Sequence, residues 1–184
     1  MIKNLEIENF KSTKQLAWRR RTMLREKYSV ASSKCIYPRQ GFSSVGGGFE
    51  RDFMRDVLEL SVDVKAYAKL DKKHALRIPY RDEHGILREY EVDFVVKTAD
   101  TMYLVETKGD RDLDRPTTAI KAKAAQSWCK SSSMAQPPVG QPTAWEYLLL
   151  SESLFKSNSG LSFAALVPLS RALTTEVVSK VGKQ

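Results

Sequence analysis

The sequence predicts an α/β fold in which a mixed β-sheet is flanked by helices. Some segments repeat apolar residues at the spacing of a helix, and others alternate apolar and polar residues as strands do. The predicted order is helix, three strands, helix, strand, helix and strand, which is typical of a mixed α/β sandwich. The chain has 184 residues, 42% of them hydrophobic, so it can bury the core of one ordinary domain.

The N-terminal part of the chain is less regular than the rest. Residues 2–8 indicate a short strand, and residues 11–28 indicate either a solvated helix or a mobile arm. Residues 38–48 are rich in glycine and other turn-forming residues, which predicts a linker. We therefore expect two parts, a basic arm or docking segment over residues 1–45 and the main domain over residues 46–184.

The main domain is predicted to open with a helix over residues 49–60, because the apolar residues of this segment fall on one face. Residues 62–70 fit neither pattern clearly. Pro116 suits the first turn of the helix that follows the central strands. The remaining predicted elements are strands over residues 75–80, 86–96, 102–107, 145–150 and 161–167, and helices over residues 117–130 and 152–157.

Two of these strands flank a short turn at residues 98–101. If this turn closes an antiparallel hairpin, the register places Asp93 opposite Glu106 and Glu91 opposite Lys108. Because side chains alternate between the faces of a sheet, the hairpin has a polar and an apolar face. The polar face carries Glu91, Asp93, Val95, Leu104, Glu106 and Lys108, and the apolar face carries Val92, Phe94, Val96, Tyr103, Val105 and Thr107.

Asp93 and Glu106 are expected to need a cation between them. Directly opposed residues have Cβ atoms about 4.5–5.5 Å apart, and like charges so placed are destabilising. Hard divalent cations take carboxylate oxygens as ligands, so two acids with open water positions suit Mg²⁺ or Mn²⁺. Lys108 lies on the same strand face, where its ammonium group can orient a water molecule or stabilise charge that develops on a phosphate.

The residues around these acids resemble the PD-(D/E)XK motif of restriction-endonuclease-like nucleases. Val92-Asp93-Phe94 supplies the first acid, although Val92 stands where the strict motif has proline, and Glu106-Thr107-Lys108-Gly109 supplies the second half. Phe49-Glu50 matches an upstream helix start, so the pattern is most similar to the endonuclease domain of type III restriction enzymes. The resemblance covers residues 49–130 and implies a restriction-endonuclease-like mixed sheet, a DNA substrate and Mg²⁺ or Mn²⁺.

The resemblance also implies further site residues. Glu50 would be another carboxylate near the metal, and Thr107 would contribute its backbone carbonyl. The helix after the motif would help to form the site and bind nucleic acid, with Trp128 packed beneath it. The candidates on this helix are Lys121, Lys123 and Gln126.

Several of these residues also have a purely structural interpretation. Glu91 and Lys108 could form a surface ion pair, which contributes little to stability. Glu50 in a first helical turn would complement the helix dipole. Lys121 and Lys123 could belong to a solvated helix face.

The positive charge of the chain is concentrated near its N-terminus. The net charge is +8, and residues 1–50 hold 10 Lys and Arg against 4 Asp and Glu, whereas residues 51–184 hold 20 against 18. A basic segment on a nearly neutral body favours a polyanionic partner such as nucleic acid. Arg19, Arg20 and Arg21 are the candidate phosphate contacts, and solubility alone or protein docking are the alternatives.

Other classes of protein are disfavoured by composition. No stretch approaches the roughly 20 apolar residues of a membrane helix, and the start has no signal-peptide pattern, so we expect a cytoplasmic protein with no membrane span. Cys35 and Cys129 are too few for a disulfide framework or a four-ligand zinc site and are expected to be reduced thiols. Residues 1–11 resemble the opening strand of ABC-type ATPases, but no Gly-Lys-Ser/Thr phosphate loop follows.

The sequence therefore predicts a metal-dependent DNA endonuclease, or the nuclease module of a restriction, repair or mobile-element system. Asp93 and Glu106 are expected to bind the metal with Glu50 in support, and Lys108 to position water or stabilise charge. The expected partners are DNA and either a second copy of the chain, as a homodimer, or a separate translocase or recognition subunit. The alternative is a DNA-binding or docking subunit with little activity of its own.

Overall fold

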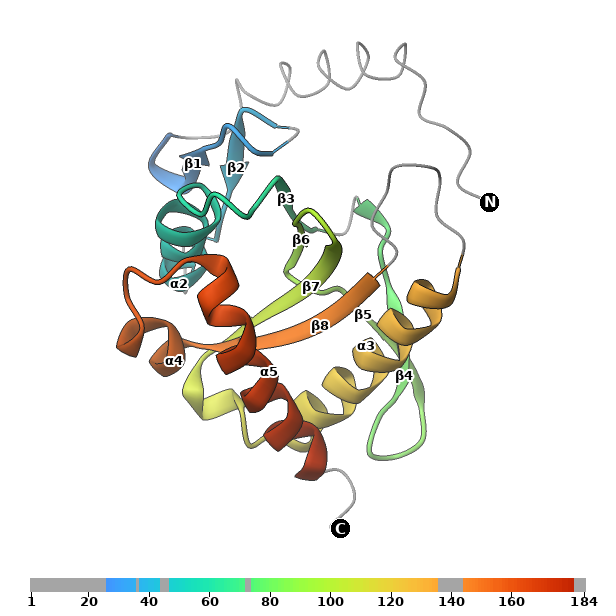
Figure 1. The fold of residues 1–184 in the computed structure, drawn as a ribbon. Coiled ribbons are helices and arrows are strands. Elements are labelled where there is room, and N and C mark those ends of the chain that lie inside the picture. The colour runs from blue at the N-terminus through green and yellow to red at the C-terminus, as the bar shows by residue number, and fades with distance from the viewer. Residues whose placement is uncertain (1–25, 36, 44–46, 72–73, 136–143, 181–184) are drawn as a thin grey trace.

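The computed structural model describes residues 26–35, 37–43, 47–71, 74–135 and 144–180 (Figure 1). Its centre is a four-stranded sheet with the order β3–β6–β7–β8. The strands are β3 (Ala66–Lys69), β6 (Phe94–Lys97), β7 (Thr101–Lys108) and β8 (Ala144–Ser151). β6 pairs in antiparallel fashion with both β3 and β7, whereas β7 and β8 are parallel. The prediction of an α/β protein with a mixed sheet is therefore confirmed at the level of class.

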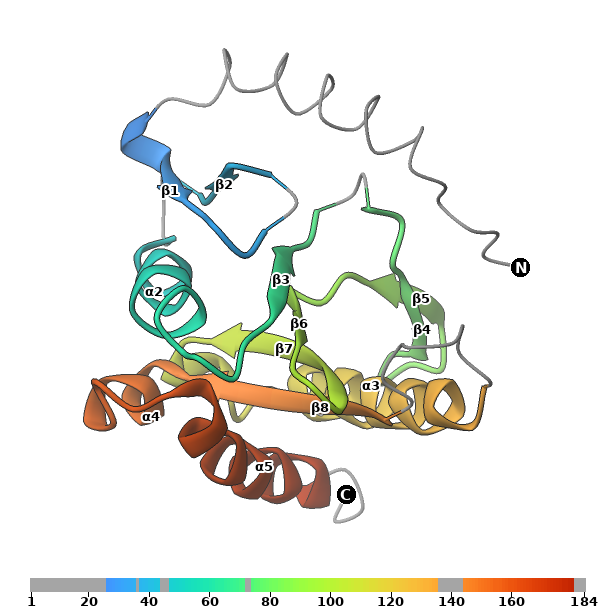
Figure 2. The same ribbon diagram turned by 45° about the horizontal axis from the view of Figure 1, so that its top comes forward.

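Helices cover both faces of this sheet (Figure 2). One face packs against a helix that begins as α2 (Gly48–Asp52) and continues directly into the wider π-helical turns of η2 (Phe53–Leu58). The other face packs against α3 (Pro116–Met134). The short helix α4 (Glu152–Ser157) and the long helix α5 (Phe163–Ser179) follow β8, and α5 contributes side chains to both cores.

The hairpin register predicted from the turn is confirmed. Lys97 pairs with Met102, and Phe94 pairs with Val105. The turn is closed by a hydrogen bond from the Thr98 backbone N–H to the Thr101 carbonyl at 2.9 Å. The register therefore brings the start of β6 alongside the end of β7, where the two predicted acids lie.

The single strand predicted over residues 86–96 is instead two strands. β5 (Leu87–Tyr90) pairs with β4 (Ile78–Arg81) in a separate hairpin, and β6 begins only at Phe94. Between them the chain bends at Asp93, whose backbone carbonyl accepts a hydrogen bond from the Leu70 N–H at 2.7 Å. Val92 consequently packs in the core between the sheet and α3, whereas Phe94 packs in the core between the sheet and η2. The prediction that both side chains lie on one face is therefore wrong.

The hairpin of β4 and β5 lies beside α3 (Figures 1 and 2). Its inner residues Ile78 and Tyr90 are buried in the same core as the small side chains of α3. At its turn, Oδ1 of Asp82 accepts hydrogen bonds from the backbone N–H groups of His84 and Ile86. The hairpin is therefore a defined arm of the domain that is separate from the four-stranded sheet.

The strand predicted over residues 161–167 is wrong, because most of this segment is the first part of α5. The Ser162 hydroxyl caps the helix by accepting a hydrogen bond from the Ala165 N–H at 3.3 Å. A short apolar run fits a strand and a helix equally, and the repeat that decides between them continues beyond residue 167. The buried residues that form this repeat are Phe163, Leu166, Val167, Ser170, Thr174 and Val177.

The described part of the predicted N-terminal arm packs against the main domain. It contains η1 (Glu26–Tyr28) and a small antiparallel pair, β1 (Ser29–Ala31) and β2 (Arg39–Gly41), where the sequence predicts a linker from residue 38. Lys34 Nζ donates hydrogen bonds to the carbonyls of Leu58 at 3.1 Å and Ser61 at 2.5 Å. The strand predicted at residues 2–8 and most of the segment 11–28 lie outside the described residues.

Two further predictions concern the chain as a whole. Within the described ranges, no helix is both long enough and apolar enough to span a membrane. Neither Cys35 nor Cys129 forms a disulfide in the part of the chain that the structure describes.

Candidate active site

Asp93 lies at the bend that precedes β6, and β7 holds its carboxylate. Oδ2 of Asp93 accepts hydrogen bonds from the Thr107 backbone N–H at 2.8 Å and from the Thr107 hydroxyl at 2.7 Å. Hydrogen bonds to an ionised carboxylate are about twice as strong as those between neutral groups. Asp93 is therefore fixed against the residue that follows Glu106.

Glu106 is a buried carboxylate with only one satisfied oxygen. Its residue is 5% exposed, Oε1 lies 2.6 Å from Lys108 Nζ, and Oε2 is buried without a hydrogen-bond partner. Burial, followed by the negative charge of Asp93, raises the pKa of Glu106 to about 7. The repulsion that the register predicts between the two acids is therefore present.

Lys108 pairs with Glu106 and not with Glu91. Burial acts to lower the pKa of Lys108, but the charge of Glu106 and the hydrogen bond to it act more strongly, so the pKa is raised overall. Lys108 therefore keeps its positive charge at neutral pH. The predicted placement of Glu91 opposite Lys108 is wrong, because the bend at Asp93 carries Glu91 away from the end of β7.

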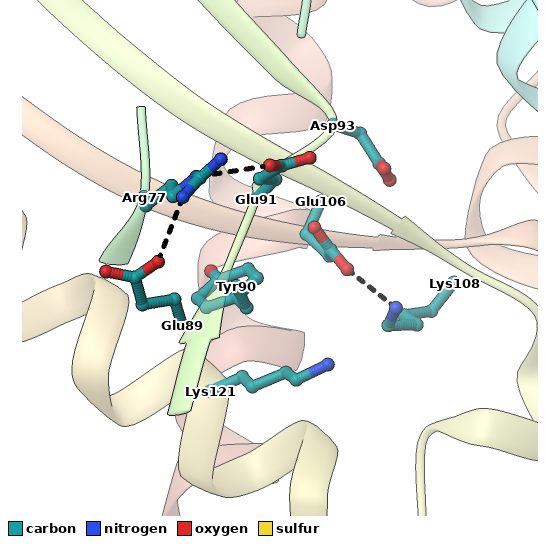
Figure 3. A pocket seen from close by; sticks show the side chains of 8 residues that line it. All are labelled: Arg77, Glu89, Tyr90, Glu91, Asp93, Glu106, Lys108 and Lys121. Carbon is teal, nitrogen blue, oxygen red and sulfur yellow. Dashed lines mark hydrogen bonds and ion pairs between the residues drawn. The ribbon is translucent and has the colours of Figure 1, made fainter. Parts of the chain in front are cut away.

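A surface cavity of about 620 Å³ brings these residues together. Asp93, Glu106 and Lys108 line it with Lys121 from α3, and the β4–β5 hairpin supplies the rest of the wall (Figure 3). The residues from the hairpin and its edges are Arg77, Glu89, Tyr90 and Glu91. The cavity thus lies where the sheet, α3 and the hairpin meet.

Lys121 extends across two tyrosine rings toward this cavity. Its Nζ lies 5.5 Å from the centre of the Tyr90 ring and 5.7 Å from that of Tyr80, within the range of cation–π contacts. Burial, and then the charge of Glu106, raise the pKa of Tyr90 well above its usual value, so this tyrosine is neutral. Tyr90 therefore forms a neutral floor between Lys121 and the acids.

Glu50 is not among the residues that line the cavity. Its Oε1 pairs with Lys69 Nζ at 3.0 Å, and its Oε2 is buried without a hydrogen-bond partner. Lys69 belongs to β3, pairs with Phe94 in the sheet and lies 5.5 Å from the centre of the Phe94 ring. The structure thus holds Glu50 against Lys69 of β3, which is the strand next to β6.

The other predicted nucleic-acid contacts are dispersed. Lys123 is exposed on α3, and Gln126 lines a different cavity between α3, β8 and α5. Trp128 packs against Trp145 with ring centres 5.2 Å apart, as expected for a residue beneath the helix. Arg19, Arg20 and Arg21 lie outside the described residues.

The donor set of Asp93 and Glu106 fits a hard divalent cation. The unpartnered Oε2 of Glu106 is the buried polar atom that a cation would satisfy, and Asp93 supplies the second carboxylate. Across the described ranges, no three His, Cys, Asp or Glu side chains gather as a ligand group. A cation held here would therefore complete its shell with water and backbone oxygen, which suits Mg²⁺ better than zinc.

The sequence left three residues near these acids without a role. Arg77 and Tyr90 reach the cavity because the β4–β5 hairpin leaves the central sheet. Lys69 of β3 reaches Glu50 of α2 because both elements pack in the same core. The period-two pattern of residues 86–96 gave no sign of the break at Asp93. Alternation along one strand would place Tyr90 on the face opposite to Asp93, so no signal in the sequence pointed to any of the three residues.

Comparison of the chain with protein-family models, with curated proteins and with solved structures finds no significant match.

Proposed function

We propose that this chain is a metal-dependent endonuclease that hydrolyses phosphodiester bonds in DNA, built on a restriction-endonuclease-like fold. The observation that carries the proposal is the buried Oε2 of Glu106, which has no hydrogen-bond partner and lies beside Asp93 and Lys108 at a surface cavity. An unsatisfied buried carboxylate oxygen is costly, and such costs are typical of sites that bind a ligand.

In this proposal Asp93 and Glu106 hold Mg²⁺ or Mn²⁺, and the backbone carbonyl of Thr107 is a further candidate ligand. When bound, the cation would polarise the phosphodiester and lower the pKa of a water molecule. The hydrogen bonds from Thr107 keep Asp93 in place, so the acid pair is arranged before substrate arrives.

Lys108 has a role of its own in the proposed reaction. Its raised pKa keeps the ammonium group protonated, and its position on Glu106 Oε1 places this group at the acid pair. From there it can donate a hydrogen bond to a phosphate oxygen or orient the attacking water. The oxygen of that water would form a bond to phosphorus as the bond from phosphorus to one sugar oxygen breaks. The water would lose a proton to solvent, and the leaving sugar oxygen would take a proton from solvent.

The direct test is nicking of supercoiled plasmid by the purified full chain with Mg²⁺ or Mn²⁺, and its loss on chelation with EDTA. Asp93→Asn, Glu106→Gln and Lys108→Met are each expected to lower the rate by about 10²-fold or more. Glu176→Gln is the matched control, because Glu176 is an exposed acid on α5 that pairs with Lys180. Cleavage at the wild-type rate by the three site variants would overturn the proposal.

The second candidate is a DNA-binding or docking subunit with little activity, acting with a separate translocase or recognition subunit. The ion pair between Lys108 and Oε1 of Glu106 forms without any metal, which is compatible with a subunit that binds no cation. Calorimetric titration separates the two functions. Salt-sensitive DNA binding without any Mg²⁺ or Mn²⁺ binding would favour this second function.

A further inference from the structure

The lining of the candidate cavity carries more acidic than basic side chains, although the proposed substrate is an anion. Its lining holds four acidic side chains, Glu89, Glu91, Asp93 and Glu106, and three basic ones, Arg77, Lys108 and Lys121. A phosphodiester strand is a polyanion and is held mainly by cationic side chains. The question is therefore which of the three cations is available to a phosphate.

Two of the three cations are committed to neighbours. Lys108 Nζ lies 2.6 Å from Glu106 Oε1 in a largely buried pair. Lys121 is extended over the rings of Tyr80 and Tyr90. Both can influence a bound phosphate, but each already has a structural contact to give up.

Arg77 is held at the cavity wall by two long ion pairs. Its guanidinium lies 3.4 Å from Glu89 Oε2 and 3.6 Å from Glu91 Oε1, and its side chain is 49% exposed (Figure 3). Charge-assisted hydrogen bonds are normally about 2.7–2.9 Å long. Long, exposed ion pairs of this kind contribute little to stability. Replacing Glu89 and Glu91 by another anion as the partner of Arg77 therefore costs little free energy.

We propose that Arg77 binds a phosphate of the DNA strand, and that Glu89 and Glu91 hold its guanidinium at the cavity wall until the DNA displaces them. The guanidinium presents paired N–H groups that match two oxygens of one phosphate. Arg77 directly precedes β4, so the β4–β5 hairpin is the arm that carries this contact. The inference rests on the proposed function, because it takes the cavity to be the place where DNA is bound.

A different role for Arg77 makes an opposite prediction. Arg77 could serve only to hold the two strands of the hairpin together through Glu89 and Glu91. Loss of Arg77 and loss of Glu89 would then both loosen the hairpin, and both would weaken DNA binding. If Arg77 binds phosphate, loss of Glu89 instead frees the guanidinium and tightens binding, whereas loss of Arg77 weakens it.

The experiment is a double-mutant cycle on DNA affinity, with Arg77→Met, Glu89→Gln and the double variant. Binding of a fluorescent duplex and of one of its single strands is measured with EDTA present, so that no cleavage occurs. Arg77→Met is expected to weaken binding about tenfold at low salt and to reduce the slope of log affinity against log salt by about 0.9. Glu89→Gln is expected to tighten binding, and to do so less when Arg77 is absent.

Arg77→Lys completes the set, because it restores the charge without the paired donors. It is expected to recover the salt slope and only part of the affinity. Thermal melting of each variant checks that the domain stays folded. Equal weakening by Arg77→Met and Glu89→Gln, or an unchanged salt slope in Arg77→Met, would overturn the inference.

The outcome is separable from that of the proposed function. DNA binding that depends on Arg77 in a chain that never cleaves plasmid would support the inference and reject the endonuclease. Cleavage that needs Asp93 and Glu106 but is indifferent to Arg77 would support the endonuclease and reject the inference.

Discussion

Glu106 is the residue on which the candidate site depends. A carboxylate that is 5% exposed needs compensation on both oxygens, and Lys108 compensates only Oε1. The negative charge of Asp93 adds to the cost of ionising it. In the absence of a cation, the protein can lower this cost by binding a proton, which is why the pKa of Glu106 rises to about 7.

The stability of the cation-free protein should therefore fall as the pH rises from about 4.5 to about 7, the range between the ordinary and the raised pKa of Glu106. In this range Glu106 binds a proton in the folded chain and not in the unfolded chain. Its ionisation above pH 7 therefore lowers the free energy of unfolding by up to about 3 kcal/mol. Thermal melting in EDTA should show this slope in the wild type and not in Glu106→Gln.

Addition of Mn²⁺ tests the ionised form of Glu106. Cation binding requires the ionised carboxylate, so the rise in melting temperature on adding Mn²⁺ should grow from pH 5 to pH 8. Glu106→Gln should show almost no such rise at either pH. A wild type whose melting temperature responds equally to Mn²⁺ at both pH values would contradict this account of Glu106.

Single residues were predictable from the sequence where a local rule decides their place. The turn at residues 98–101 fixed the register, and the register gave the proximity of Asp93 to Glu106. The partners of Glu50 and Glu91 were not predictable. Lys69 meets Glu50 because β3 and α2 pack in one core, and Arg77 meets Glu91 through the pairing of β4 with β5.

At the scale of elements, the clasp between the start of β6 and the end of β7 positions the acids. The Thr107 hydroxyl and backbone N–H both donate to Asp93, while the Leu70 N–H donates to the Asp93 carbonyl. These bonds hold the bend that separates β5 from β6. They are tertiary contacts that a local pattern does not show, so the alternation of residues 86–96 predicted one continuous strand.

The apolar run of residues 161–167 was also predicted wrongly, because only its continuation as α5 identifies it as helical.

Thr107→Val tests this clasp. The substitution removes the 2.7 Å hydrogen bond to Asp93 and keeps the backbone one, so we expect a loss of about 1.5–3 kcal/mol in the free energy of unfolding. Plasmid nicking should fall more steeply than stability explains, because Asp93 loses half of its support. Urea denaturation and the nicking rate measure the two effects.

Thr174→Val is the control for that experiment. Thr174 is buried on α5, donates to the Ser170 carbonyl at 2.7 Å and accepts from the Leu149 N–H at 2.8 Å. Its loss should lower stability at least as much and leave nicking of the folded protein unchanged. Equal loss of nicking in both variants would mean that stability alone controls the rate.

For the whole molecule, the candidate site depends on three units that are distant in the sequence. The central sheet supplies the two acids, α3 supplies Lys121, and the hairpin of β4 and β5 supplies Arg77. The class of fold followed from local periodicity, because each element carries its own pattern. The way these units come together could not be predicted from local periodicity. It depends on the packing of the hairpin beside α3, which is decided by the shared core around Ile78 and Tyr90.

Charge is the other property of the whole molecule that bears on DNA. Of the net charge of +8, residues 1–50 carry +6, since they hold 10 basic and 4 acidic residues. The sequence prediction assigns this excess to phosphate contacts by Arg19, Arg20 and Arg21. If the prediction is right, the affinity for DNA depends on where the positive charge lies in the chain and not on the net charge.

Substituting Arg19, Arg20 and Arg21 together by Gln should therefore weaken DNA binding and reduce its salt slope by up to about 0.9 for each arginine that contacts a phosphate. The matched control removes three positive charges from the body of the domain, at the exposed residues Lys65, Arg171 and Lys180. Both variants have the same net charge, so a mere effect of total charge would weaken binding equally in both. A larger effect of the N-terminal substitutions, measured by fluorescence anisotropy over a range of salt, would assign direct DNA contacts to this segment. An unchanged salt slope would leave solubility or protein docking as its role.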